Sequence, residues 1–132
     1  MTNKDDNNTF LKYFKGIKPT RAWINDMEAK DYNWLHRHTR TDGRLGLSVL
    51  IGLKIPADME RPASSNRTNN PPDGQTEFIG AGNAAQFVEP SILIKFKERL
   101  CIVFPYDVLH QVYPHFSNQK RRTMTMNVDV FF

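Results

Sequence analysis

The chain has 132 residues, a formal net charge of +4 and a pI of about 9.3. This length predicts one domain. Lysine and arginine are spread along the chain, and no nucleic-acid-binding motif is visible, so the basic charge does not indicate a nucleic-acid partner. No apolar run approaches the length of a membrane span, and we expect no membrane partner.

Cysteine usage indicates the cellular compartment. Cys101 is the only cysteine, so no intramolecular disulfide can form. This fits a reducing compartment, and we expect a cytoplasmic protein. Because Cys101 lies between Leu100 and Ile102, we expect it to be buried as a small apolar side chain rather than to act as a nucleophile.

The first residues predict little regular structure. Residues 1–8 are polar and are expected to form a loose tail, followed by a single domain over residues 9–132. Thr9 can cap a short helix that carries Phe10, Tyr13 and Phe14 on one face and ends at Gly16. Met27–Lys30 could add a helical turn.

The rest of the chain reads as short strands, which is typical of a sandwich or jelly roll. The strongest is residues 45–55, where Leu47, Val49 and Ile51 continue an apolar face and Ser48 lies on the other. A turn is expected at 41–43. The other expected strands are 21–25, 32–38, 75–79, 85–88, 91–97, 100–104, 110–113 and 123–131. Residues 56–74, rich in Pro, Ser, Asn and Asp, are expected to form a long loop or lid.

The last strand alternates cleanly between two kinds of side chain. Met124, Met126, Val128, Val130 and Phe132 share one face, and Arg121, Thr123, Thr125, Asn127 and Asp129 share the other. The polar face is either solvated or lines a pocket between two sheets.

Three histidines suggest a metal site. His36 and His38 are two residues apart, so on one strand they would point the same way together with Trp34. His110, from another strand, could supply a third imidazole, a ligand that suits iron and similar divalent ions. A His-x-His pair is also common without a metal, and His115 shows that a histidine here need not be a ligand.

Several ordered segments give the chain a family likeness. In the first half they are residues 23–25, 31–33, 36–38, Ser48 and 53–56, and in the second half 100–105, 110–114, 121–123 and Asn127. From about Trp23 onward the chain resembles iron(II)/2-oxoglutarate-dependent dioxygenases, and most of all the compact oxygenases of bacteria and their phages. The resemblance implies a mainly β, double-stranded β-helix fold (a cupin-like jelly roll).

The resemblance also implies roles for residues. His36 and His110 would be the first and last iron(II) ligands, and His38 would occupy the place of the family's usual carboxylate, with Asp42 as an alternative to His36 or His38. The co-substrate 2-oxoglutarate would be bound by Arg121, Thr123, Asn127 and Tyr32. Arg122 competes with Arg121, but alternation favours Arg121 because it shares a face with Thr123.

The activity implied by the resemblance is oxidative decarboxylation of 2-oxoglutarate coupled to hydroxylation of an unidentified substrate. Two alternatives stay open: a non-catalytic jelly-roll binding module, and a cupin-like metalloprotein with three histidines and no 2-oxoglutarate. A phage-encoded chain would work in the host cytoplasm. The apolar residues 130–132 mildly favour a homo-oligomer.

Overall fold

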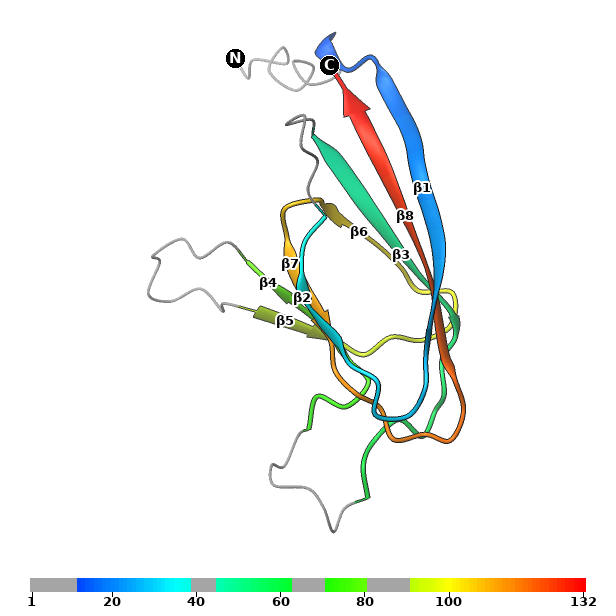
Figure 1. The fold of residues 1–132 in the computed structure, drawn as a ribbon. Helices are drawn as coiled ribbons and strands as arrows, with labels where there is room; N and C mark the ends of the chain where they lie inside the picture. The colour runs from blue at the N-terminus through cyan, green and yellow to red at the C-terminus, as the bar shows by residue number, and fades with distance from the viewer. Residues whose placement is uncertain (1–11, 39–44, 63–70, 81–90) are drawn as a thin grey trace, which may run out of the picture.

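The computed structural model describes residues 12–38, 45–62, 71–80 and 91–132, and this part of the chain forms two four-stranded antiparallel sheets that face each other (Figure 1). Strand order in the first sheet is β1 (Gly16–Met27), β8 (Arg121–Phe131), β3 (Gly46–Lys54) and β6 (Cys101–Pro105). In the second sheet it is β2 (Asn33–His36), β7 (Leu109–Val112), β4 (Thr76–Ile79) and β5 (Ser91–Ile94). The predicted mainly β, cupin-like jelly roll is confirmed.

Strand boundaries differ from the prediction where pairing extends or ends a strand. β1 is longer than residues 21–25 because it pairs with β8 from Gly16 to Met27. The helical turn predicted for Met27–Lys30 is wrong: Met27 ends the strand, and Lys30 has a φ of 71° in the turn that follows.

In the described residues, no helix has the length and apolar character needed to cross a membrane.

Some predicted elements fall where the structure gives no description. The tail 1–8, the start of the helix at Thr9 and Phe10, the turn at 41–43 and the strand at 85–88 lie outside the described residues. At the edge of the described part, Lys12 and Tyr13 are helical.

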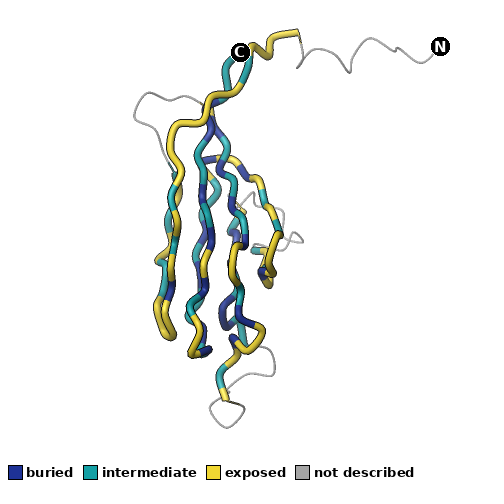
Figure 2. Tube along the Cα trace, turned by 90° about the vertical axis from the view of Figure 1, so that its right-hand side faces the viewer, coloured by how far each residue is buried: buried dark blue, intermediate teal, exposed yellow. Residues whose placement is uncertain are grey.

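The inward face of the first sheet carries buried polar side chains as well as apolar ones. Along β3 the buried side is the one that carries Ser48 and Leu50, and the apolar residues Leu47, Val49 and Ile51 on the other side are only half-buried. Figure 2 shows this alternation of buried and exposed positions along the strands. Cys101 on β6 pairs with Ile51 on β3 and is exposed, so its predicted burial is wrong.

The apolar core occupies only part of the space between the sheets. Its buried members are Leu50, Phe78, Phe96 and Phe104, and the Phe78 and Phe104 rings meet edge to face with centroids 4.9 Å apart. Because the core side chains come from both sheets, their packing holds the sheets together. The remaining inner surface is free for polar side chains.

The two ends of the long 56–74 loop are tied to each other, and Met59 ties the loop to the segment after β7. Asp73 is buried and accepts hydrogen bonds from the backbone NH of Arg61 (3.0 Å) and from its guanidinium. Met59, also buried, accepts a backbone hydrogen bond from Phe116 (2.9 Å). Residues 63–70 in the middle of the loop lie outside the described residues.

Candidate metal and co-substrate site

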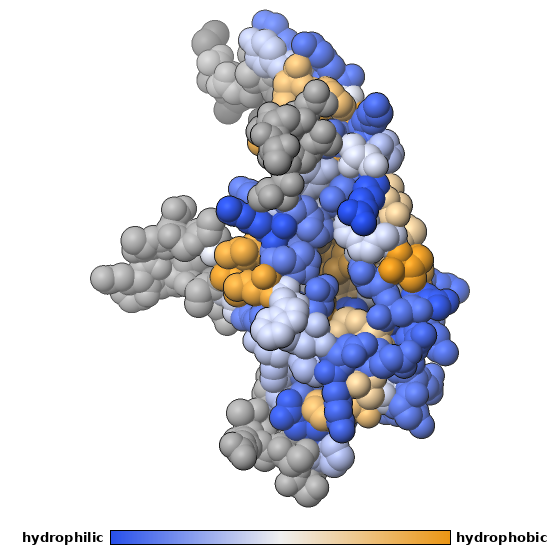
Figure 3. Space-filling view, viewed as in Figure 1, coloured by the Kyte–Doolittle hydropathy of each residue, from blue (hydrophilic) through white to orange (hydrophobic). Residues whose placement is uncertain are grey.

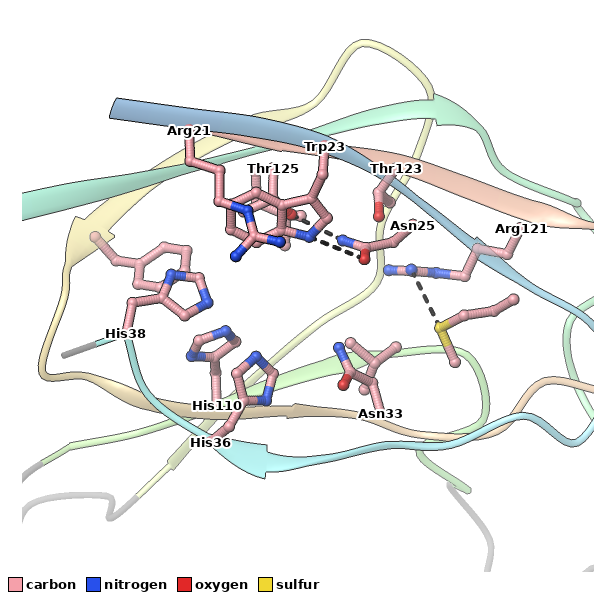
Figure 4. A pocket seen from close by; sticks show the side chains of 14 residues that line it. Arg21, Trp23, Asn25, Asn33, His36, His38, His110, Arg121, Thr123 and Thr125 are labelled. Carbon is pink, nitrogen blue, oxygen red and sulfur yellow. Dashed lines mark hydrogen bonds between the residues drawn. The ribbon is translucent and has the colours of Figure 1, made fainter. Parts of the chain in front are cut away.

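Three histidines converge between the two sheets, as Figure 4 shows. His36 on β2 and His110 on β7 are direct cross-strand partners, with ring centroids 4.2 Å apart. His38 follows the end of β2, where its backbone NH donates to the carbonyl of Tyr106 (2.9 Å). One ring nitrogen from each histidine lies within 4.8 Å of the other two, which is close enough for one metal ion to bind all three.

A break in strand register decides which β2 side chains face the histidines. Asn33 pairs with Val112 and His36 with His110, so the partners are three residues apart on β2 and two apart on β7. Asn33 and His36 therefore both line the cavity. The prediction that Trp34 shares the face of His36 is wrong, because this extra residue turns Trp34 outward, where 76% of it is exposed.

Hydrogen bonds fix how each imidazole is presented. His36 Nδ1 donates to the carbonyl of Trp34 (2.5 Å) and His110 Nδ1 to the carbonyl of Val108 (3.0 Å). A carbonyl only accepts, so in the neutral ring the proton is on Nδ1 and the lone pair is on Nε2. This is the outer-shell arrangement that orients histidine ligands in metal sites.

The imidazole of His38 is oriented by side chains, whereas those of His36 and His110 are oriented by backbone carbonyls. Its Nδ1 lies 2.6 Å from Ser48 Oγ and 3.0 Å from Asn127 Oδ1, and the serine hydroxyl in turn donates to the same Asn127 oxygen (3.0 Å). The amide oxygen can only accept, which again places the proton on Nδ1 and leaves Nε2 free. Asn127 therefore orients a histidine rather than facing the cavity.

Burial keeps two of the imidazoles, those of His38 and His110, in the neutral form that binds metals. Desolvation, together with the nearby His36 and His38, lowers the pKa of His110 to about 4. Desolvation, followed by the effect of His36, also lowers the pKa of His38. Neutral imidazole is the ligand form, so His38 and His110 are ready to bind a cation at neutral pH.

A buried arginine lies at the other end of the cavity. Arg121 is 1% exposed, its Nη2 donates to Thr76 Oγ1 (3.3 Å), and its Nε has no hydrogen-bond partner. Its guanidinium carbon is 5.4 Å from the centre of the Phe96 ring. Burial lowers its pKa to about 10, so the group is still cationic at neutral pH.

A buried cation with no acidic partner is costly unless an anion binds to it. No carboxylate lines the cavity among the described residues. The planar donor array of Arg121 suits a carboxylate. Thr123, which is also buried and lines the cavity, could assist.

The other predicted co-substrate residues lie elsewhere. Arg122, the competitor of Arg121, is half exposed and forms two hydrogen bonds with Asp26 (2.7 and 2.8 Å). Tyr32 does not line the cavity, and its hydroxyl donates to the Gln111 side chain. Asp42, the alternative metal ligand, lies outside the described residues.

The cavity has a volume of about 270 Å³, and some of its walls were missed from the sequence. β1 contributes Arg21, Trp23, Asn25 and Met27, which alternate along the strand. Their spacing of two residues indicates that they share one face of the strand, but nothing in the sequence shows whether that face points to the interior.

The sequence matches the model of the family described as "Putative 2OG-Fe(II) oxygenase" over residues 21–127. The chain belongs to this family. The match covers every described residue assigned above to the metal and co-substrate ends of the cavity. No curated protein matches the sequence.

Two solved structures share the fold. An oxidoreductase of the 2OG-Fe(II) oxygenase family from Burkholderia pseudomallei has a TM-score of 0.64 and 17% identity, over 86% of this chain and 45% of its own. EvdMO1 has a TM-score of 0.60 and 20% identity, over 87% of this chain and 28% of its own. The chain thus spans less than half the length of either structure.

The residues of the cavity fit iron(II) and 2-oxoglutarate, the two groups that the family description names. Three imidazoles with oriented lone pairs suit iron(II), and the buried Arg121, which has no acidic partner among the described residues of the cavity, suits a carboxylate of 2-oxoglutarate. The metal set departs from the usual two-histidine, one-carboxylate triad, since the described ligands include no carboxylate.

Proposed function

We propose that the protein is an iron(II)- and 2-oxoglutarate-dependent dioxygenase that hydroxylates a substrate still to be identified. The observation that carries this proposal is the pairing, in one cavity, of a three-histidine cluster with a buried arginine whose Nε has no partner. The histidine cluster alone, or the buried arginine alone, could have a purely structural role. Together they match the two ends of a dicarboxylate that chelates a metal with one end. The family membership supports the same proposal.

Each residue has a defined task in this proposal. His36, His38 and His110 hold iron(II), and Arg121, with Thr123 beside it, binds the carboxylate of 2-oxoglutarate that is remote from the metal. Ser48 and Asn127 keep His38 in the correct tautomer and orientation. Tyr32, also expected at this site, lies outside the cavity, and Asp42 is not among the described residues.

The bound iron and 2-oxoglutarate supply the oxidising chemistry, and the protein positions the reactants and limits water. His110 packs against Phe78 and Phe104, with ring centroids at 5.9 and 4.8 Å, so the metal end of the cavity has an apolar wall. Such a wall excludes water and strengthens the charge interactions inside. The hydroxylation uses one oxygen atom of dioxygen for the substrate and the other for succinate, with release of carbon dioxide.

An anaerobic titration tests this proposal. Iron(II) is added to the metal-free protein and then 2-oxoglutarate, while the visible spectrum is followed for the weak charge-transfer band of 2-oxoglutarate chelated to iron(II). We expect the band to saturate at one equivalent of iron. Folded protein that binds iron but gives no band would contradict the co-substrate assignment.

The absence of a carboxylate among the described ligands favours a second candidate, a cupin-like metalloprotein that binds its metal through three histidines and uses no 2-oxoglutarate. The two candidates differ at Arg121. If the protein uses no 2-oxoglutarate, Arg121→Met leaves its metal-dependent function intact, whereas the dioxygenase loses co-substrate binding. A closed tetrahedral metal shell would favour a purely structural site in a binding module.

We further propose a cytoplasmic protein, working in the host cytoplasm if the gene is carried by a phage, that forms homo-oligomers. Exposed apolar side chains support association; they include Ile24 (51%) and Val103 (55%) on the first sheet and Phe132 (44%), which follows β8. The face seen in Figure 3 is mainly hydrophilic, with apolar residues gathered in separate patches. Light scattering of the purified chain gives the mass of the particle, and a monomer at all concentrations would contradict self-association.

A further inference from the structure

A second arginine lines the same cavity without a role in holding iron or 2-oxoglutarate. Arg21 lies on β1, and Figure 4 shows its guanidinium extending from the strand toward the histidines, on the opposite side from Arg121. Unlike Arg121, it is exposed and so can be reached from solvent.

An aromatic platform holds the Arg21 head in this position. Its guanidinium carbon is 5.1 Å from the centre of the Trp23 ring, in a cation–π contact. Trp23 is fixed in turn: its indole NH donates to Asn25 Oδ1 (3.1 Å), and Asn25 donates to Thr125 Oγ1 (2.9 Å).

Trp23 also links Arg21 to the metal end of the cavity. Its ring meets His38 edge to face, with centroids 5.6 Å apart. Arg21 is therefore placed beside the histidine cluster, while Arg121 is placed beyond it, past Thr123 (Figure 4).

The charges in the cavity leave Arg21 without compensation. Two guanidinium groups and no carboxylate line the cavity among the described residues. Iron(II) and the dianion of 2-oxoglutarate cancel, and neutral histidines add no charge. The loaded site consequently remains cationic, and in a partly desolvated cavity this excess favours binding of another anion.

We propose that Arg21 is a substrate-binding residue, and that the substrate carries an oxyanion, a carboxylate or a phosphate, which Arg21 binds while the reacting carbon lies near the histidines. This inference rests on the proposed dioxygenase function and adds the chemical class of the substrate. Guanidinium is suited to the role because it can bind either oxyanion through two parallel hydrogen bonds while stacked on an aromatic ring.

Simple oxyanions test the proposal without knowledge of the substrate. The chain has two tryptophans, so Trp34→Phe, a change at an exposed side chain outside the cavity, leaves Trp23 as the only indole reporter. In this background, protein loaded anaerobically with iron(II) and 2-oxoglutarate is titrated with acetate, inorganic phosphate or neutral acetamide at constant ionic strength. The fluorescence of Trp23 is the readout.

We expect a saturable change in Trp23 fluorescence with acetate or phosphate and no change with acetamide. The anion that binds more tightly indicates whether the substrate carries a carboxylate or a phosphate. Arg21→Gln should weaken this binding about tenfold or more, as expected for loss of a charged hydrogen bond. Arg21→Lys should restore part of it. The matched control Lys18→Gln removes a positive charge elsewhere on β1 and should change nothing.

The proposal is overturned if no anion gives a saturable response, if acetamide binds as well as acetate, or if Arg21→Gln binds anions as the parent does. It is also overturned if Arg21→Gln abolishes the 2-oxoglutarate charge-transfer band, because Arg21 would then hold the co-substrate. Failure of the dioxygenase proposal looks different: the band is missing in the parent protein, whatever the anion titration gives.

Discussion

His36 and His110 face each other across the β2–β7 pair, with ring centroids 4.2 Å apart. Two parallel features of their surroundings make the pair suited to a metal: each Nδ1 donates to a backbone carbonyl, and each Nε2 is left free. Backbone carbonyls are fixed by the strand, so this presentation does not depend on a mobile side chain. Cross-strand pairing is thus the basis of the site.

Replacing His110 should remove the metal. In His110→Ala the cluster loses its most buried member, and two imidazoles bind a divalent ion far more weakly than three. We expect iron(II) binding, measured by anaerobic calorimetry, to weaken at least 100-fold. His115→Gln, a change at a buried histidine outside the cluster, is the control for any general effect of losing a histidine. Unchanged iron affinity in folded His110→Ala would remove this residue from the site.

Replacing Arg121 should abolish 2-oxoglutarate binding without lowering the stability of the fold. Arg121→Met removes a buried, uncompensated cation and leaves an apolar side chain next to Phe96 and Met27. Such replacements are often neutral or stabilising. The midpoint of urea unfolding of metal-free protein should therefore stay the same or rise, while 2-oxoglutarate binding is lost. Arg122→Met, on the exposed side of the same strand, should leave 2-oxoglutarate binding intact. Marked destabilisation by Arg121→Met would show that the arginine is structurally satisfied.

The side chains behind His38 should tune metal affinity. Asn127→Ala removes the acceptor that fixes the Nδ1 proton of His38, and Ser48 alone remains. Loss of an outer-shell partner typically costs 10–100-fold in metal affinity, and we expect a decrease of about that size. Cobalt(II) titration measures it, and the d–d spectrum reports any change in geometry. A decrease of less than twofold would mean that Asn127 does not orient His38.

Acid should destabilise the metal-free protein through His110. Its pKa is lowered to about 4 in the folded state by burial, against about 6.5 in the unfolded chain. Between these values the unfolded chain binds more protons, so the free energy of unfolding falls as the pH is lowered from 6.5 toward 4. At pH 5 we expect a loss on the order of 1–2 kcal/mol relative to pH 7.

Urea unfolding at pH 7 and pH 5, in the presence of a chelator, measures this loss. Carboxylates titrate in part of the same range, so the informative quantity is the difference from His110→Gln, which should lose less stability in acid. Equal losses in the two proteins would show that His110 does not titrate with a lowered pKa.

The sequence predicts much of this arrangement because the β-strand period is regular. In β8 the alternation separates Arg121 and Thr123 from Arg122, and the structure buries the first two and exposes the third. The described residues form eight strands, and each of them overlaps a stretch that the sequence predicts as a strand. These features depend on local pattern, which one sequence displays in full.

Other features depend on pairing between distant segments. The break in register between Asn33 and His36 turns Trp34 outward, and only the partner strand β7 reveals it. Similarly, β3 presents Ser48 rather than Leu47 and Val49 to the interior, because the space between the sheets is a polar cavity as well as a core. Arg21 and Trp23 were missed for the same reason, since no local signal distinguishes the inner face of β1.

A crystal structure of the protein grown anaerobically with iron(II) and 2-oxoglutarate tests the central claim most directly. We predict iron bound by His36, His38 and His110, with 2-oxoglutarate chelating the metal and its far carboxylate paired with Arg121. Iron bound away from these histidines, a closed protein shell that excludes the co-substrate, or 2-oxoglutarate without contact to Arg121 would contradict the account.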